Sequence, residues 1–409
     1  MAISLVDALR EQSNDGSFDS DVSIVSYKTG FPVIDYYLGY MVKVVDPVTE
    51  EVIKKYPCVG ITAGSYSMLA GPTSSSKTTL TVQIAANIVR NFDEGFVMHY
   101  DLEGACNYTR IQALTKFSSK EISEGKYIIK QGDCSIDEMY EAIMQIYFEK
   151  KAHPEKYKYD TGMVDEFNKP IIIYQPTVVI LDSIPTMSTY INENDKSERK
   201  KIAELEGSTY SNRLAKEITQ FLVKLLPKLR AANIILLAIN QVKDKIDIGF
   251  SKSPAEILHM KQNWALPGGK AVKFYAQNVL IHEAIGSEKF NKDDDGFDGN
   301  GVHIDIIKSR TNQTGRTLHM VFDKVHGVDS VRSSLIYAKE CGLITGNKNS
   351  SYFNSNKDVK FSVKNAPTEF RNRPELYKIM YDNLIPALNE VLSDVTDEED
   401  TYDTNLLDY

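Results

Sequence analysis

The segment Gly71–Thr78 constrains this chain more than any other part of the sequence. It has the sequence Gly-Pro-Thr-Ser-Ser-Ser-Lys-Thr, follows the apolar run Tyr66–Leu69 and precedes a helical pattern that begins at Thr79. A loop in this place points successive backbone N–H groups at a phosphate, and the N-terminus of the following helix adds positive potential. The strand, loop and helix together predict a site for a nucleoside triphosphate.

Each side chain of this loop has a separate predicted task. Lys77 would bridge the outer phosphates, and Thr78 offers a hydroxyl to Mg²⁺. Ser76 stands where the general motif has Gly, at a backbone position that Gly adopts most easily. The residues predicted to bind the nucleotide here are Gly71, Pro72, Thr73, Ser74, Ser75, Ser76, Lys77, Thr78 and Thr79.

Apolar runs bounded by turn residues recur along the chain, with helical patterns between them. This alternation predicts an α/β fold with a largely parallel central sheet. An amphipathic helix is expected over Ser211–Ala231, covering one face of the sheet. The predicted buried strands are Tyr66–Leu69, Gly95–Tyr100, Thr177–Leu181, Asn233–Ile239, Asn278–Ile281 and His303–Ile307.

Polar side chains follow three of these runs, at the sheet edge where ligands of α/β proteins bind. Asp182 directly follows Thr177–Leu181, and we expect it to hold Mg²⁺ together with Thr78. Glu103 is the candidate for activating the attacking water, and Gln241 for sensing the γ-phosphate. The simpler alternative is that these residues only terminate strands or cap helices.

Charge and composition narrow the class of protein. The 47 Lys and Arg against 56 Asp and Glu give a net charge of -9, but residues 394–409 hold seven acids and no base. The rest of the chain is therefore close to neutral, which leaves a polyanionic partner possible. The four cysteines lack zinc or disulfide spacing, and no apolar run is long enough to span a bilayer, so we expect a cytoplasmic protein without a membrane partner.

The pattern changes after about Ser330, which predicts additions to one main domain. A helix over Ser333–Cys341, the polar stretch Asn347–Asn356 and a helix over Pro374–Leu392 suggest a small α+β domain. Asp46–Tyr56 and Phe148–Pro170 are expected to be surface excursions. The predicted organisation is a short oligomerisation segment at 1–22, the core at 23–330, a small domain at 331–392 and a disordered acidic tail at 393–409.

The order of these motifs resembles the RecA family over roughly residues 21 to 330. After the phosphate loop come Asp101-Leu102-Glu103, Asp182-Ser183, Asn240-Gln241 and then Pro267–Tyr275, with Gly268-Gly269-Lys270 inside it. The entry segment Ser26–Asp35 is similar to that of the family. Lys308-Ser309-Arg310 and the serine at position 76 resemble the phage branch represented by UvsX.

The resemblance implies roles for particular residues. Glu103 would be the catalytic glutamate, and Gln241 would couple the nucleotide state to DNA. Tyr108 would stack on adenine, with an ordinary packed tyrosine as the alternative. Lys308 and Arg310 would reach the γ-phosphate bound by a neighbouring subunit, as an arginine finger does, unless they are simply solvated.

The segment from Val242 to Lys273 is basic in an acidic chain, with a local net charge of +3, and it contains the only tryptophan. Cations beside an aromatic ring suit single-strand binding that tolerates any sequence. The segment matches the family's second DNA-binding loop. The first is expected near Met187–Tyr210, with an exposed charged helix as the alternative. The predicted DNA-binding residues are Lys243, Lys245, Lys252, Lys261, Trp264, Gly268, Gly269, Lys270 and Lys273.

The sequence therefore predicts an ATP- and Mg²⁺-dependent DNA recombinase that forms a filament on single-stranded DNA and pairs it with duplex DNA. Expected partners are single- and double-stranded DNA, further copies of the chain, and single-strand-binding and mediator proteins, in the host-cell cytoplasm if the chain is phage-encoded. Two alternatives stay open: a hexameric helicase with the same core, and an ATP-gated DNA-binding adaptor without strand exchange. The two glycines before Lys270 are also explained by helix capping alone.

Overall fold

The central sheet is built from the predicted apolar runs. The computed structural model describes residues 24–187, 208–244, 260–261, 264–286, 299–347 and 349–396. Within these residues the sheet has nine strands in the order β17-β16-β15-β14-β5-β11-β10-β6-β7. The six strands from β14 to β7 run parallel, and β15, β16 and β17 add an antiparallel edge. The predicted α/β class with a largely parallel sheet is confirmed.

Each predicted strand is present, and all but β6 are longer than the predicted apolar run, β15 most of all. The parallel strands are β5 (Tyr66–Gly71), β6 (Phe96–Asp101), β7 (Tyr127–Gln131), β10 (Thr177–Asp182), β11 (Ile234–Gln241) and β14 (Asn278–Ala284). The antiparallel strands are β15 (Gly299–Ser309), β16 (Arg316–Asp323) and β17 (Gly327–Val328).

Both faces of the sheet are buried because successive side chains of a strand point to opposite faces. In β10, Val178 and Ile180 join the core on the side of α3, whereas Val179 and Leu181 join the core on the side of α9. A continuous apolar run is therefore needed, since no position of the strand faces water.

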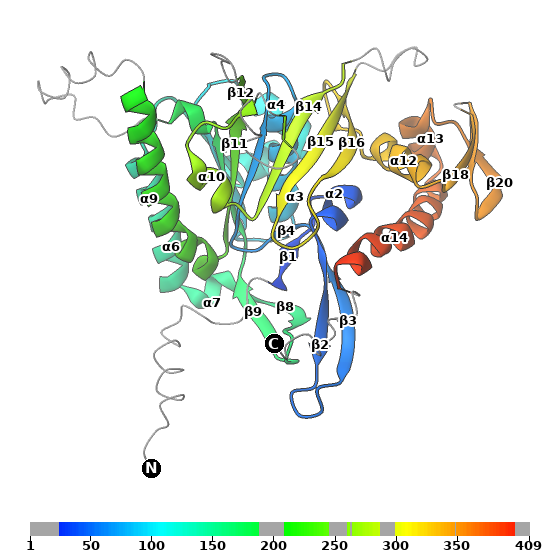
Figure 1. Ribbon diagram of the computed structural model, residues 1–409, viewed down its shortest axis with the longest axis horizontal. Coiled ribbons are helices and arrows are strands. Elements are labelled where there is room, and N and C mark those ends of the chain that lie inside the picture. The colour runs from blue at the N-terminus through cyan, green and yellow to red at the C-terminus, as the bar shows by residue number, and fades with distance from the viewer. Residues whose placement is uncertain are drawn as a thin grey trace, which may run out of the picture.

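Helices cover the two faces. On one side lie α3 (Lys77–Val89), α4 (Tyr108–Thr115) and α5 (Ser119–Ser123). The other side carries α6 (Ile136–Ala152), α9 (Ser208–Ala232) and α10 (Lys270–Phe274), with α6 and α9 packed side by side (Figure 1). The predicted helix Ser211–Ala231 is thus confirmed within α9. Shorter elements are α2 (Pro32–Tyr37), α7 (Pro154–Tyr157) and a 3-10 turn at Ile184–Thr186.

The two predicted surface excursions form hairpins outside the central sheet. One pairs β2 (Tyr40–Val45) with β3 (Val52–Cys58), and the other pairs β8 (Lys158–Val164) with β9 (Pro170–Tyr174). Figure 1 shows the β2–β3 hairpin projecting away from the sheet. The hairpins meet where the Tyr56 hydroxyl donates to the Val164 carbonyl at 2.7 Å. Small pairs are β1 (Ser26–Tyr27) with β4 (Ile61–Thr62), and β12 (Lys243–Asp244) with β13 (Trp264–Ala265).

A C-terminal unit follows β17. It contains α12 (Ser330–Glu340), a three-stranded sheet of β18 (Ile344–Asn347), β19 (Ser350–Phe353) and β20 (Asn356–Phe361), then α13 (Ala366–Asn372) and α14 (Glu375–Thr396). The polar stretch Asn347–Asn356 lies in this sheet. α14 packs on α2 and β2 and continues past Leu392, where the sequence predicted its end. Residues 1–22 and the acidic residues 397–409 lie outside the described residues.

Candidate nucleotide and DNA site

The phosphate loop lies at the carboxyl end of β5, between the neighbouring strands β14 and β11. Ser76 has φ 61° and ψ 20°, and Ser74 has φ 60°, so both serines adopt the left-handed conformation. That conformation is the one Gly adopts without cost. Ser76 therefore keeps the backbone geometry of the usual glycine, and the substitution does not abolish the loop.

Side chains beneath the loop hold it in place. The Lys77 ammonium donates to the Pro72 carbonyl at 2.5 Å and to the Ser75 hydroxyl at 3.3 Å. The His282 ring lies 3.0 Å from the Ser75 carbonyl, to which its Nδ1–H donates. Burial lowers the pKa of His282 to about 3, so the ring is neutral. The sequence reasoning missed His282, although a polar residue ending the apolar run Val279–Ile281 was a signal.

Thr78 and Asp182 meet at the start of α3. The Thr78 hydroxyl donates to Asp182 Oδ2 at 2.6 Å. Burial raises the pKa of Asp182 to about 6, against the opposing effects of Thr78 and Lys77. A hydroxyl and a carboxylate are the oxygen ligands that Mg²⁺ uses beside nucleotide phosphates, and a bound cation would favour the charged form of this buried acid. The donor set therefore fits Mg²⁺.

Three neighbouring strand ends bring Glu103, Ser183 and Gln241 together. Glu103 Oε1 accepts hydrogen bonds from the Ser183 hydroxyl at 2.8 Å and from the Gln241 amide at 2.7 Å. Glu103 and Ser183 follow β6 and β10, Gln241 ends β11, and these three strands are adjacent in the sheet. The predicted water-activating residue and the predicted γ-phosphate sensor are thus in direct contact. Ser183 is a further member that sequence reasoning did not single out.

The turn that carries Glu103 is fixed by the buried Asp101. Its carboxylate accepts from the backbone N–H groups of Ala105 and Cys106 at 3.1 and 2.8 Å. Gln131, at the end of β7, donates to the same carboxylate at 2.8 Å. This leaves Glu103 itself exposed at the sheet edge, where a catalytic carboxylate has access to substrate.

Tyr108 is the first residue of α4, and its side chain is 50% exposed. It is not a core tyrosine, so the packed alternative does not describe it. Two residues later, Arg110 donates to the carbonyls of Lys324 and Val325 at 2.6 and 2.9 Å. The adenine-stacking role of Tyr108 stays a prediction.

Lys308 and Arg310 lie together at the C-terminal end of α10. The Lys308 ammonium donates to the carbonyls of Lys273 and Phe274 at 2.7 and 2.6 Å, and Arg310 donates to Phe274 at 2.8 Å. Burial, and then the neighbouring Arg310, lower the pKa of Lys308 to about 8. Both cations therefore bond to carbonyls of their own chain, while Arg310 stays exposed, and their role towards a neighbouring copy stays a prediction.

The basic segment after Gln241 is only partly described. Lys243 is exposed on β12, whereas the Trp264 side chain is 8% exposed in the core beside α9. Lys261 pairs with Glu283 at 2.5 Å and lies 4.8 Å from the centre of the Trp264 ring. In this conformation Trp264 is not presented to a base. Lys245, Lys252 and most of the predicted first loop, residues 188–207, lie outside the described residues.

Gly268 and Gly269 are required by local geometry. Their φ angles are +91° and +78°, and a Cβ on either would lie 2.9 Å from a side-chain carbon, of Val272 and Ala215 respectively. They lead directly into α10, which starts at the exposed Lys270. Turning the chain into this helix accounts for both glycines, and their contact with DNA stays a prediction.

A phosphate loop on a central parallel strand, with carboxylates and an amide at the ends of three neighbouring strands, defines a RecA-like nucleotide-binding core. Comparison with known proteins agrees with this class. The chain is 28% identical over 178 residues to the RecA protein of Azospirillum lipoferum, covering 42% of this chain and 45% of that protein. It is 26% identical over 298 residues to the RecA protein of Chlamydia trachomatis serovar L2, covering 72% of this chain and 68% of that protein.

The RecA protein of Chlamydia muridarum matches to the same extent as that of C. trachomatis. These distant similarities support membership of the RecA family, although the first spans less than half of the relative's length. No protein-family model matches the chain. Among the described residues, no helix is long and apolar enough to cross a membrane.

Proposed function

We propose that this protein is an ATP-dependent DNA recombinase, of the phage UvsX-like branch, that forms filaments on single-stranded DNA and exchanges strands with a homologous duplex. The observation that carries the proposal is the contact between Gln241 and Glu103. It joins the hydrolytic centre to the last residue of β11, and β12, in the basic segment, begins two residues later. The proposed nucleotide sensor therefore directly precedes the predicted DNA-binding segment.

The residues of the chain divide the work of hydrolysis. The loop N–H groups and Lys77 hold the phosphates, while Thr78 and Asp182 hold the magnesium ion that offsets phosphate charge when bound. Glu103 accepts a proton from the attacking water. The Lys77 ammonium has three N–H donors, so it can bind a phosphate oxygen while it is bonded to the Pro72 carbonyl.

The contact between Gln241 and Glu103 can couple ATP binding to the binding of DNA. When its amide turns to the γ-phosphate, it releases Glu103 and pulls on the backbone that continues into β12. ATP then favours one arrangement of the basic segment, and loss of the γ-phosphate favours the other. The affinity for single-stranded DNA therefore depends on the bound nucleotide.

Lys308 and Arg310 complete the site of a neighbouring copy in this proposal. Their present ligands are two carbonyls at the end of α10, the helix that follows Gly268 and Gly269. A phosphate bound by an adjacent subunit would compete with these carbonyls for both cations, because an anionic acceptor binds a cation more strongly than a neutral carbonyl does. Hydrolysis is then a property of the filament.

The proposal is tested by binding and exchange assays on the purified chain. Affinity for a labelled single strand is measured without nucleotide, with ATP and with ADP, and strand transfer is followed with a homologous and a non-homologous duplex. We expect tight binding only with ATP and transfer only with homology. Gln241→Asn, which keeps the amide but shortens its reach, should remove the ATP dependence, while the exposed Gln145→Asn on α6 should not.

The alternatives give different results in the same assays. Unwinding of a forked duplex without a homologous strand identifies a helicase. Hydrolysis that DNA does not stimulate, with ATP-dependent DNA binding but no exchange, identifies an adaptor. Equal single-strand binding with and without ATP contradicts the coupling through Gln241.

A further inference from the structure

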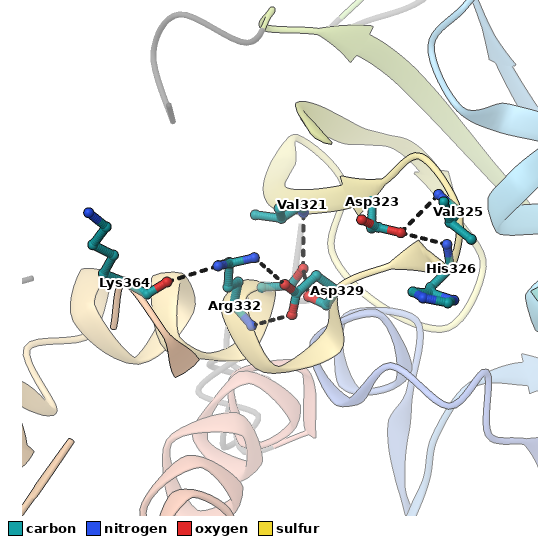
Figure 2. A network of polar contacts seen from close by, with 8 residues as sticks. Val321, Asp323, Val325, His326, Asp329, Arg332 and Lys364 are labelled. Atoms are coloured by element: carbon teal, nitrogen blue, oxygen red, sulfur yellow. Dashed lines mark hydrogen bonds and ion pairs between the residues drawn. The ribbon is translucent and has the colours of Figure 1, made fainter. Parts of the chain in front are cut away.

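The turn Asp323–Gly327, between β16 and β17, joins the core to the C-terminal unit. The Asp323 carboxylate accepts from the backbone N–H groups of Val325 and His326 at 2.8 and 2.6 Å, which fixes the shape of the turn (Figure 2). A Cβ on Gly327, whose φ is +82°, would lie 2.4 Å from the Gln83 side chain. The turn is therefore rigid and closely fitted to α3.

Two helices that begin at the nucleotide site hold this turn. Gln83 of α3 donates to the His326 carbonyl and accepts from the Val328 N–H, both at 2.9 Å. From α4, Arg110 donates to the Lys324 and Val325 carbonyls. α3 starts with Lys77, and α4 starts with Tyr108. A shift of the turn would therefore move the helices that begin with Lys77 of the phosphate loop and with Tyr108, the residue predicted to stack on adenine.

The strands that flank this turn are held by a polar network at the start of α12, where the Asp329 N–H donates to the Val321 carbonyl of β16 at 2.8 Å. Arg332 Nη1 pairs with Asp329 at 2.9 Å, and Nη2 donates to the Lys364 carbonyl of the C-terminal unit at 2.9 Å. The Ser333 hydroxyl accepts from the Val321 N–H of β16 at 3.0 Å. Figure 2 shows Arg332 between Asp329 and Lys364. The side chains of Arg332 and Asp329 are only 16% and 9% exposed, so water screens the pair little.

We propose that Arg332 is a positioning residue for ATP binding, through which the C-terminal unit sets the affinity of the core for nucleotide. Arg332 joins the Lys364 carbonyl of the C-terminal unit to Asp329, which bonds Val321 of β16 beside the turn. The turn carries that restraint to Gln83 and Arg110, and α3 and α4 transmit it to the site. The inference rests on the proposed ATP site. By reciprocity, ATP binding also stabilises the docked position of the C-terminal unit.

The test measures binding of ATP that carries a fluorescent ribose label, together with KM and kcat for hydrolysis. Arg332→Met removes both contacts and should weaken ATP binding and raise KM by about 5-fold or more, with kcat changed by less than about 2-fold. Arg332→Lys keeps the positive charge on a single ammonium group in place of the guanidinium fork, so its ATP affinity and KM should be intermediate. A smaller amount of folded protein would instead lower the amplitude of the fluorescence change on ATP binding and the apparent kcat, and it would leave KM unchanged.

A matched control exists in the same unit. Arg373 also donates to a backbone carbonyl, that of Lys360 at 2.8 Å, and to a carboxylate, that of Glu375 at 3.2 Å, but both partners belong to the C-terminal unit. Arg373→Met should leave the ATP dissociation constant unchanged. An equal loss of ATP affinity in the two variants would overturn the specific role of Arg332.

The path through the turn is tested by combining Arg332→Met with Arg110→Met. If both arginines act through the same turn, the double variant should lose less ATP affinity than the product of the two single losses. Independent, multiplicative losses would overturn the path, and unchanged affinity in Arg332→Met would overturn the inference as a whole. A wild-type chain that binds no labelled ATP would instead contradict the proposed function.

Discussion

The nucleotide edge of the sheet and the basic segment Val242–Lys273, which directly follows Gln241, differ in how complete they are within one chain. At the nucleotide edge, Lys77, Thr78, Asp182, Glu103 and Gln241 already lie within hydrogen-bonding contact of one another or of the loop. In the basic segment Trp264 is buried, and the carbonyls at the end of α10 accept from Lys308 and Arg310, at the end of β15.

The comparison shows which of the candidate site residues the fold holds in place. The residues proposed for hydrolysis are held by strand ends, whose positions the core fixes. The residues proposed to contact DNA or a neighbouring copy are satisfied by internal contacts that a ligand must replace. Under the proposed function, a single chain is therefore ready to hold ATP but must rearrange to bind DNA or a neighbour's phosphate.

The largest loss of activity is expected from a change at the nucleotide edge of the sheet. Lys77→Ala should abolish ATP hydrolysis, because no other described cation bonds to the phosphate loop. Steady-state phosphate release with and without single-stranded DNA measures this. Lys126→Ala serves as control, since that ammonium also donates to a backbone carbonyl, of Phe92, and should retain turnover. DNA-stimulated turnover in Lys77→Ala would break the assignment of the loop.

The incomplete region is tested by the double variant Lys308→Met with Arg310→Met, for which we expect turnover to fall about 10³-fold. Mixing it with Lys77→Ala should restore activity, because in an equal random mixture about a quarter of head-to-tail interfaces combine an intact loop with intact cations. A mixture as inactive as its two components would show that the cations do not act between subunits.

Glu103→Gln should slow hydrolysis about 10²-fold or more while ATP binding is kept. The amide oxygen can still accept from Ser183 and Gln241, so the geometry survives and only the proton acceptor is lost. Single-turnover hydrolysis and binding of labelled ATP separate the two effects. Loss of binding would assign Glu103 a structural role in place of a catalytic one.

Trp264 is the only tryptophan, so its fluorescence reports on the basic segment directly. We expect a blue-shifted emission without DNA, because the ring is buried, and a change in emission when single-stranded DNA is added with ATP. If the ring then stacks on a base, Trp264→Ala weakens single-strand binding by about 1–3 kcal/mol. Emission that does not respond to DNA would assign Trp264 to the core alone.

The smallest effect concerns pH. The pKa of Asp182 is raised to about 6 by burial, and Mg²⁺ binds the carboxylate form. The affinity for Mg²⁺ is therefore complete above the pKa and falls as pH drops through 6, by about tenfold between pH 7 and 5. Mg²⁺ titrations of the ATP complex, corrected by the same titrations of free ATP, measure this. A flat profile would mean that Asp182 does not contact the metal.

The sequence by itself determined the strands, the phosphate loop and the residues at the strand ends, because these depend on the order of residues within short segments. A loop between an apolar strand and a helix, and polar residues directly after buried strands, placed Asp182, Glu103 and Gln241 at one sheet edge because parallel strands end together. Apolar runs without alternation likewise predicted strands covered on both faces.

Only the tertiary structure decided the contacts between segments distant in the chain. His282 beneath the loop, the shared bonds of Glu103, the burial of Trp264 and the bond from Arg332 to the Lys364 carbonyl depend on which strands and helices become neighbours. A residue's type and local spacing indicate what it can bond to, but strand order and packing choose which partner it meets.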